Sequence, residues 1–225
     1  MNIVFDFDGT IANSTPYHRA GWESTIKELG LNYELDQLLP YEPNLKERFD
    51  SYRRIKKGFL EKVDVKYKIC SYFQIEDEDV LVNKIMSLKE SLTISKIFQE
   101  SLTNTLGNVG VNLIASLNTL KSQNTLVGII SSTRETIISS FLHKCGILDF
   151  FDFIIGEESL TNPYGTLFDK PSPYTKSVLN STNKAMDIYV GDNERIDKKF
   201  AQTCEAKFVY ADYKTDFLIL MDKLI

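Results

Sequence analysis

A regular alternation of helical and strand-like segments through the second half of the chain is the feature that most constrains the fold. Helical periodicity is found at residues 111–123, 135–145, 172–179, 198–203 and 216–224. Short apolar runs typical of buried strands lie between them, at 126–131, 153–155, 187–190 and 207–210. Helices that connect successive strands in this way build a parallel sheet with helices on both faces. We therefore predict an α/β fold of the Rossmann-like type.

The start of the chain supplies one more strand and two acids. Residues 3–7 form a short apolar run rich in β-formers, and the run places Asp6 and Asp8 at its carboxyl end. Gly9 and Thr10 then turn the chain. In an open α/β sheet, ligands bind outside the carboxyl ends of the strands. The two acids are therefore expected to take part in chemistry.

Between this strand and the alternating half lies a block that reads as entirely helical. Amphipathic helices are predicted at residues 17–29, 45–61, 65–73 and 79–92, and a linker is predicted at 103–110. We predict a Rossmann-like core made of residues 1–13 and 108–225, and a helical cap at 14–107. An insertion directly after the strand that carries the acids is well placed to act as a lid.

Polar side chains follow three other predicted strands or loops of the core. Ser131 and Ser132 end one strand, Lys170 opens the stretch KPSP, and Asp192 and Asp197 lie in GDNERID after another strand. Taken singly, such residues are ordinary turn, cap or surface residues. Together they place several carboxylates, hydroxyls and an ammonium at one edge of the sheet.

Four carboxylates at one edge of the sheet need cations. Asp6, Asp8, Asp192 and Asp197 would raise one another's pKa and resist ionisation if they shared a partly buried crevice. A divalent ion together with Lys170 resolves that conflict. Oxygen ligands of this kind favour Mg²⁺, so the sequence predicts a magnesium site.

Composition and charge exclude several classes of protein. The chain has 26 Lys and Arg against 31 Asp and Glu, a formal net charge of −5, which disfavours nucleic-acid binding. Its densest basic run, which includes Arg53, Arg54, Lys56 and Lys57, reads as a solvated helix face. We find neither a secretory signal nor a membrane-spanning stretch, so we expect no membrane partner and a cytoplasmic location.

These motifs, in this order, resemble the four signature motifs of the haloacid dehalogenase superfamily, in its phosphatase branch. The matching residues are DFDGT, the strand ending at Ser131, Lys170 in KPSP, and GDNERID. The helical insertion resembles the cap of the phosphoglycolate phosphatase and β-phosphoglucomutase group. The resemblance implies a magnesium-dependent phosphatase that hydrolyses a small phosphorylated metabolite through an aspartyl-phosphate.

The resemblance also implies a role for each motif residue. Asp6 would be the nucleophile, and Asp8 would be the general acid for the leaving group and then the general base for water. Mg²⁺ would be held by Asp6, the main-chain carbonyl of Asp8, Asp192 and Asp197. Ser131 and Lys170 would hold the phosphoryl oxygens. The expected phosphate-binding set is Asp6, Gly9, Thr10, Ser131, Ser132 and Lys170.

One departure from the family pattern concerns the last motif. Its two acids, Asp192 and Asp197, have four residues between them, where three are commoner. The longer spacing also occurs in the superfamily, but Glu194 of the same loop is an alternative outer acid.

Other activities of the superfamily remain alternatives. A phosphosugar mutase resembling β-phosphoglucomutase would share DGTIANSTPYHRAGW, with His18 at the cap hinge, but such mutases tend to have Glu-Asp in place of Gly191-Asp192. A dehalogenase usually lacks the second acid of the first motif, so Asp8 argues against it. A non-catalytic regulatory protein of this fold would have lost a motif residue, and none is lost.

Substrate specificity is expected to reside in the cap. Basic residues of the insertion could face the crevice: Arg48, Arg53, Arg54, Lys56 and Lys57. Arg134 and Arg195, which follow core strands, could also contact an anionic leaving group. No feature of the sequence specifies an oligomeric state or one particular phosphate ester.

Overall fold

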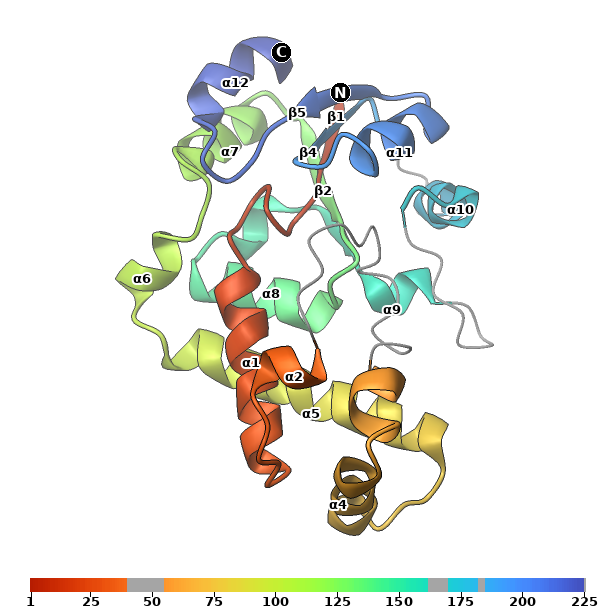
Figure 1. Ribbon diagram of the computed structural model, residues 1–225. Coiled ribbons are helices and arrows are strands. Elements are labelled where there is room, and N and C mark those ends of the chain that lie inside the picture. Colours follow the sequence, from red (N-terminus) through yellow and green to blue (C-terminus); the bar gives the residue numbers. More distant parts are fainter. Residues whose placement is uncertain (40–54, 162–169, 182–184, 225) are drawn as a thin grey trace. The chain divides into compact units, whose positions relative to one another are not determined.

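The structure, a computed structural model, describes residues 1–39, 55–161, 170–181 and 185–224. The chain divides into two compact units (Figure 1). Unit 1 comprises Met1–Thr15 and Glu100–Ile225, and unit 2 comprises Pro16–Gln99. Residues 100–107, which the sequence assigned to the insertion, group with unit 1 because helix α6 (Leu102–Leu106) packs against helix α8 (Glu135–Lys144).

Unit 1 is built on a five-stranded parallel sheet in the order β3-β2-β1-β4-β5. The strands are β1 (Asn2–Phe5), β2 (Leu126–Ile130), β3 (Phe153–Ile155), β4 (Ile188–Gly191) and β5 (Lys207–Tyr210). The predicted fold class is confirmed, since each strand falls on a predicted apolar run. β1 is the central strand, so its carboxyl end has a neighbouring strand on either side.

Helices cover both faces of this sheet. Besides α6 and α8, unit 1 contains α7 (Leu113–Ser122), the 3₁₀ turn η3 (Leu148–Phe150), α9 (Glu157–Leu160), α10 (Pro173–Ser181), α11 (Asp197–Thr203) and α12 (Phe217–Leu224). On one face the Phe5 ring lies 6.1 Å from the Phe217 ring of α12. On the other face the Tyr189 ring lies 5.2 Å from the Phe200 ring of α11. In Figure 1, α7 and α12 lie on one side of the sheet, and α10 and α11 on the other.

The described part of unit 2 is helical. Its helices are α1 (Thr15–Glu28), α2 (Leu35–Leu38), the π-helical turn η2 (Lys56–Leu60), α4 (Val63–Phe73) and α5 (Glu78–Gln99). They enclose a core of their own that includes Ile26, Leu38, Phe59, Ile69 and Ile85. Most of the helix predicted at 45–61 lies outside the described residues.

The predicted linker at 103–110 differs from the structure, because α6 occupies its first half. Ser101 caps this short helix: its hydroxyl accepts a hydrogen bond from the Asn104 backbone N–H at 3.2 Å. Of the residues that indicated a linker, Asn104 lies within this helix, and Gly107, Asn108 and Gly110 follow it.

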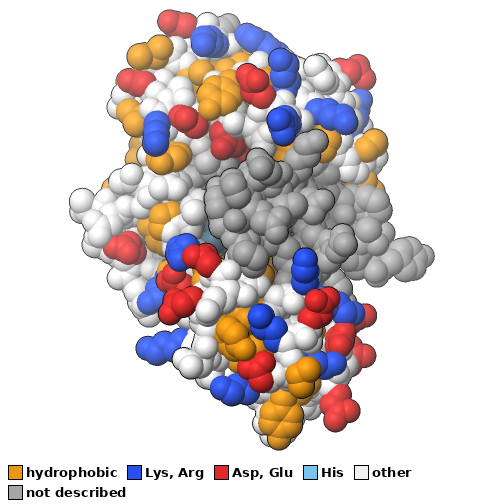
Figure 2. Space-filling model, viewed as in Figure 1, with side chains coloured by type: hydrophobic (Ala, Val, Ile, Leu, Met, Phe, Trp, Pro, Cys, Tyr) orange, Lys and Arg blue, Asp and Glu red, His pale blue; other side chains and the backbone are white. Residues whose placement is uncertain are grey.

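Charges are mixed on the described part of the face that Figure 2 shows. In the face shown in Figure 2, Lys and Arg side chains alternate with Asp and Glu over the described parts. None of the helices in the described residues combines the length and apolar character needed to cross a bilayer.

Candidate active site

Asp6 and Asp8 lie just after the carboxyl end of β1, in the interior of unit 1. The Asp6 backbone N–H donates to the Val190 carbonyl of β4 at 2.8 Å, so the chain still follows the sheet at this point. Both acids are only 6% exposed. Buried carboxylates require partners, and the two acids have different ones.

Asp6 lies against the ammonium of Lys170. The Lys170 Nζ atom is 2.7 Å from Asp6 Oδ1, 2.8 Å from Asp197 Oδ1 and 2.6 Å from the Tyr189 hydroxyl oxygen. An ammonium has three N–H donors, so Lys170 can donate to each of these acceptors. Lys170 is itself buried, at 4% exposure. It is therefore an interior counter-charge and not an ordinary surface lysine.

The balance of charge around Asp6 is still unfavourable to its ionised form. Burial, together with the neighbouring carboxylates of Asp197 and Asp8, raises the pKa of Asp6 from 3.8 to about 8, although Lys170 acts to lower it. A nucleophilic carboxylate must be ionised. A further positive charge close to Asp6 would therefore favour its ionised form.

Three carboxylates converge where such a charge could bind. One oxygen each from Asp6, Asp192 and Asp197 lie within 4.8 Å of one another. Two glycines make this approach possible: a Cβ atom on Gly9 would lie 2.3 Å from Asp192 Oδ2, and one on Gly191 would lie 2.4 Å from Asp197 Oδ2. Gly9 also has a φ of +82°, which favours glycine. A hard divalent cation such as Mg²⁺ fits this oxygen donor set.

The structure distinguishes the two candidate outer acids of the last motif. Asp197 begins α11 with its carboxylate buried, and its Oδ2 accepts a hydrogen bond from the Asn193 backbone N–H at 3.0 Å. Glu194 is exposed on the same loop. The loop thus brings Asp197, and not Glu194, to Asp6.

Asp8 is surrounded by hydroxyl groups. The side chains of Ser14 and Thr133 both donate hydrogen bonds to its carboxylate, and the Ser131 Oγ atom lies 3.4 Å from its Oδ2. The Thr133 backbone N–H donates to Ser131 Oγ at 3.2 Å, which ties the two hydroxyls together. Asp8 is therefore held by neutral donors, whereas Asp6 is held by a cation.

The remaining residues of the predicted phosphate-binding set lie in the same two loops. Gly9 and Thr10 follow β1, and Ser132, which is half-buried, follows β2. Thr10 is fully buried, and its hydroxyl finds no hydrogen-bond partner within the described parts of the chain. A buried hydroxyl without a protein partner is uncommon in folded proteins, so the Thr10 hydroxyl is an available donor in this loop.

Sequence reasoning missed Tyr189, Thr133 and Ser14. Tyr189 sits in an apolar strand, where it reads as a core residue. Thr133 lies two residues after Ser131, and Ser14 lies four residues after DFDGT, so position close to a motif was the available signal for these two.

The basic residues proposed for specificity have varied surroundings. Lys56 pairs with Glu78 at 3.1 Å, and Lys57 is exposed. The Arg134 Nε atom lies 3.5 Å from a Glu158 carboxylate oxygen, and Arg195 is exposed. Arg48, Arg53 and Arg54 lie outside the described residues.

The candidate hinge histidine contacts a buried lysine within unit 2. The His18 Nδ1 atom is 2.7 Å from Lys89 Nζ, and Lys89 is 7% exposed. The Lys89 ammonium also lies 5.9 Å from the centre of the Trp22 ring. His18 therefore belongs to an interior polar contact of the helical unit.

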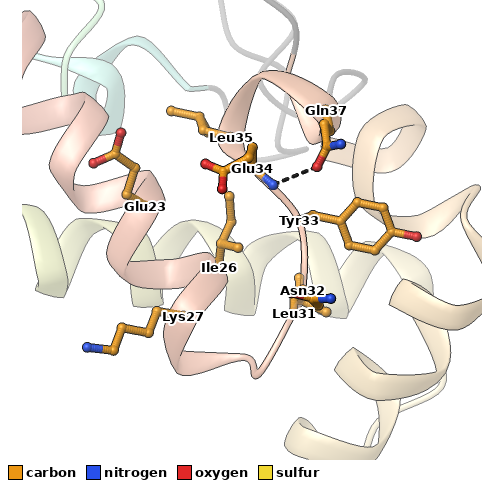
Figure 3. Close-up of a pocket in the computed structure, with 9 residues that line it drawn as sticks. All are labelled: Glu23, Ile26, Lys27, Leu31, Asn32, Tyr33, Glu34, Leu35 and Gln37. Carbon is orange, nitrogen blue, oxygen red and sulfur yellow. Dashed lines mark hydrogen bonds between the residues drawn. The ribbon is translucent and has the colours of Figure 1, made fainter.

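Unit 2 also has a surface hollow of about 470 Å³. Its lining, drawn in Figure 3, comes from the end of α1, the loop that follows and α2: Glu23, Ile26, Lys27, Leu31, Asn32, Tyr33, Glu34, Leu35 and Gln37. The Glu34 backbone N–H donates to Gln37 Oε1 across its edge at 2.7 Å. The hollow contains none of the predicted catalytic residues.

Comparisons with known proteins agree with this geometry. A family model described as haloacid dehalogenase-like hydrolase matches residues 3–211. No curated protein matches the chain by sequence.

Three solved structures share the fold at low sequence identity. A predicted phosphoglycolate phosphatase from Haemophilus somnus is 18% identical, with a TM-score of 0.62 over 98% of this chain and 97% of that one. The hydrolase YfnB from Bacillus subtilis, bound to magnesium, is 14% identical, with a TM-score of 0.61 over 98% and 97%. β-Phosphoglucomutase from Clostridium difficile is 18% identical, with a TM-score of 0.60 over 99% and 96%.

Proposed function

The chain belongs to the haloacid dehalogenase-like hydrolases, and from this membership and the geometry of the site we propose that it is a magnesium-dependent phosphatase. Its substrate would be a small phosphorylated metabolite. The observation that carries the proposal is the pairing of two buried acids with different environments. Asp6 lies among a lysine and two further carboxylates, and Asp8 lies among hydroxyls.

Asp6 is the proposed nucleophile. Its carboxylate oxygen attacks phosphorus, forming the acyl-phosphate bond as the bond to the leaving oxygen breaks. Asp8 gives its proton to that oxygen, and then takes a proton from the water that cleaves the acyl phosphate. Phosphate and the free alcohol are released, and both acids return to their starting states. Thr10, Ser131 and Lys170 would hold the phosphoryl oxygens.

Lys170 would hold the carboxylates of Asp6 and Asp197 in place, because its ammonium contacts both. Asp6, Asp192 and Asp197 would hold Mg²⁺. When bound, Mg²⁺ supplies positive charge that neutralises these acids and stabilises the charge of the transferring phosphoryl group.

Hydrolysis of p-nitrophenyl phosphate with and without Mg²⁺ tests the proposal. We expect metal-dependent turnover, and we expect Asp6→Asn to reduce kcat by about 10³-fold or more, as the loss of a nucleophile does. Asp222→Asn in α12 is the matched control, since Asp222 is exposed and outside the site. Equal turnover by wild type and Asp6→Asn would show that the nucleophile is assigned wrongly.

Incubation with β-glucose 1-phosphate separates a phosphatase from a phosphosugar mutase. A phosphatase releases inorganic phosphate, whereas a mutase produces glucose 6-phosphate. Dominant formation of the isomer would replace the phosphatase proposal by the mutase. A screen of phosphorylated metabolites would then identify the ester that the wild type hydrolyses fastest.

A further inference from the structure

Tyr189 makes contacts that its place in an apolar strand does not explain. Its side chain is fully buried, and its hydroxyl oxygen lies 2.6 Å from Lys170 Nζ and 3.0 Å from the Ile130 carbonyl oxygen. Ile130 is the last residue of β2, and Ser131 follows it directly. One phenol therefore touches both the lysine of the site and the backbone next to its serine.

The geometry fixes the direction of these hydrogen bonds. The ammonium can only donate, and the carbonyl can only accept. The hydroxyl of Tyr189 therefore accepts from Lys170 and donates to Ile130. Burial, the largest contribution, raises the pKa of Tyr189 well above 10, so the phenol keeps the proton that it donates.

The register of the sheet explains how one side chain reaches both partners. Tyr189 of β4 pairs with Val4 of β1, and Val4 pairs in turn with Gly128 of β2. Residues in register point to the same face of a parallel sheet. The Tyr189 side chain therefore crosses β1, the strand that carries Asp6, to reach β2. Gly128, which has no side chain, lies on the same face.

We propose that Tyr189 is a positioning residue, which sets the place of the Lys170 ammonium relative to the Ser131 loop. This inference rests on the proposed phosphatase function. Without the hydroxyl, Lys170 keeps its two carboxylate acceptors but loses the one that ties it to β2. The ammonium and the serine would then no longer be held at a fixed separation, and the phosphoryl group would bind less well between them.

Tyr189→Phe tests the proposal because it removes only the hydroxyl. With p-nitrophenyl phosphate and Mg²⁺, we expect kcat to fall about 10- to 100-fold, the range for a lost hydrogen bond to a charged group and a displaced catalytic side chain. The KM should rise as well, because the phosphoryl group of the bound ester depends on the same separation of Lys170 and Ser131. The dissociation constant for inorganic phosphate, measured by calorimetry with Mg²⁺, should rise by a similar factor.

Phe200→Leu is the matched control. It disturbs the packing of the same aromatic ring, because Phe200 lies edge-on to Tyr189, but it leaves the hydroxyl in place. We expect it to lower Tm with a kcat per folded molecule close to that of wild type. A purely structural Tyr189 would give the same pattern for Tyr189→Phe.

The outcomes separate this proposal from the proposed function. A folded Tyr189→Phe that loses turnover or phosphate affinity supports the positioning role, and one that keeps both overturns it. If wild type hydrolyses no ester, the phosphatase proposal fails, and phosphate binding alone decides the role of Tyr189. A wild type that neither hydrolyses esters nor binds phosphate overturns both.

Discussion

Unit 1 encloses its central ion pairs, whereas unit 2 leaves comparable pairs in contact with solvent. Lys170 lies 2.8 Å from Asp197, and their side chains are 3% and 1% exposed. Lys66 lies 2.7 Å from Glu78, but these side chains are 37% and 35% exposed. The distances are nearly equal, so burial and not geometry makes the difference. Water stabilises each charge of the exposed pair separately, whereas each buried charge depends on its partner.

Removal of the buried lysine gives the largest expected change. Lys170→Met leaves Asp6 and Asp197 without their shared cation, and we expect the free energy of unfolding to fall by about 3–5 kcal/mol, as for other broken buried pairs. Chemical denaturation at a pH above the pKa of Asp6 measures it. The double variant Lys170→Met/Asp197→Asn should regain part of the loss. A decrease in the free energy of unfolding as small as that expected for an exposed pair would show that the two units do not differ in this respect.

A titration with Mg²⁺ at different pH values tests how burial affects the Asp6 carboxyl group. Because the pKa of Asp6 is raised from 3.8 to about 8, the folded metal-free protein holds a proton that the unfolded chain releases. Its stability should therefore decrease as pH rises from about 4 to about 8. Mg²⁺ must displace the same proton, so its affinity should weaken about tenfold for each pH unit below 8.

Calorimetric melting with and without Mg²⁺ at about pH 6 and about pH 8 measures both effects. The increase in Tm on adding Mg²⁺ should be larger at the higher pH. Asp6→Asn is the control, since an amide does not titrate in this range. An equal increase at both pH values would contradict the protonation of Asp6.

A neutral partner of the site should have a smaller effect than the lysine. Thr133→Val keeps the shape of the side chain but removes the hydroxyl that donates to Asp8. We expect kcat to fall about 10- to 100-fold, because a hydrogen bond to a charged group contributes about 1.5–3 kcal/mol. The control is Thr136→Val, an exposed threonine at the start of α8. Steady-state kinetics measures both variants. If both had the kcat of wild type, Thr133 would have no role in catalysis.

The smallest effect is expected in unit 2. Lys66→Met breaks a pair as short as that of Lys170, but the free energy of unfolding should change by no more than about 1 kcal/mol. Added salt should reduce even this difference, since it screens exposed charges. Denaturation at low and high salt measures the change. A loss as large as that of Lys170→Met would mean that burial does not distinguish the two pairs.

The strands of the sheet could be predicted because parallel strands are covered on both faces and so read as continuous apolar runs. The short helices α2, α6 and α9 could not be predicted, since each is too short to show a helical period. In α6 the cap by Ser101 outweighs the asparagines and glycine that suggested a linker.

The residue types of the site could be predicted, but not all of their contacts. Asp6, Asp192 and Asp197 follow strands whose carboxyl ends meet at one edge, so their convergence follows from the fold. Lys170 was expected to contact phosphate, and the structure shows where its ammonium points: at two carboxylates and Tyr189. That last contact joins segments far apart in the sequence, and no local pattern encodes it.

The order of strands in the sheet determines when this core can form during synthesis of the chain. β1 emerges first, but its two neighbours are β2 at Leu126–Ile130 and β4 at Ile188–Gly191. The central strand can therefore pair only after β2 and β4 have been synthesised, and such long-range pairing is slow. Unit 2, in contrast, is continuous in sequence and leaves the ribosome before β2 does. The helical unit can thus fold while the strand that carries Asp6 is still unpaired.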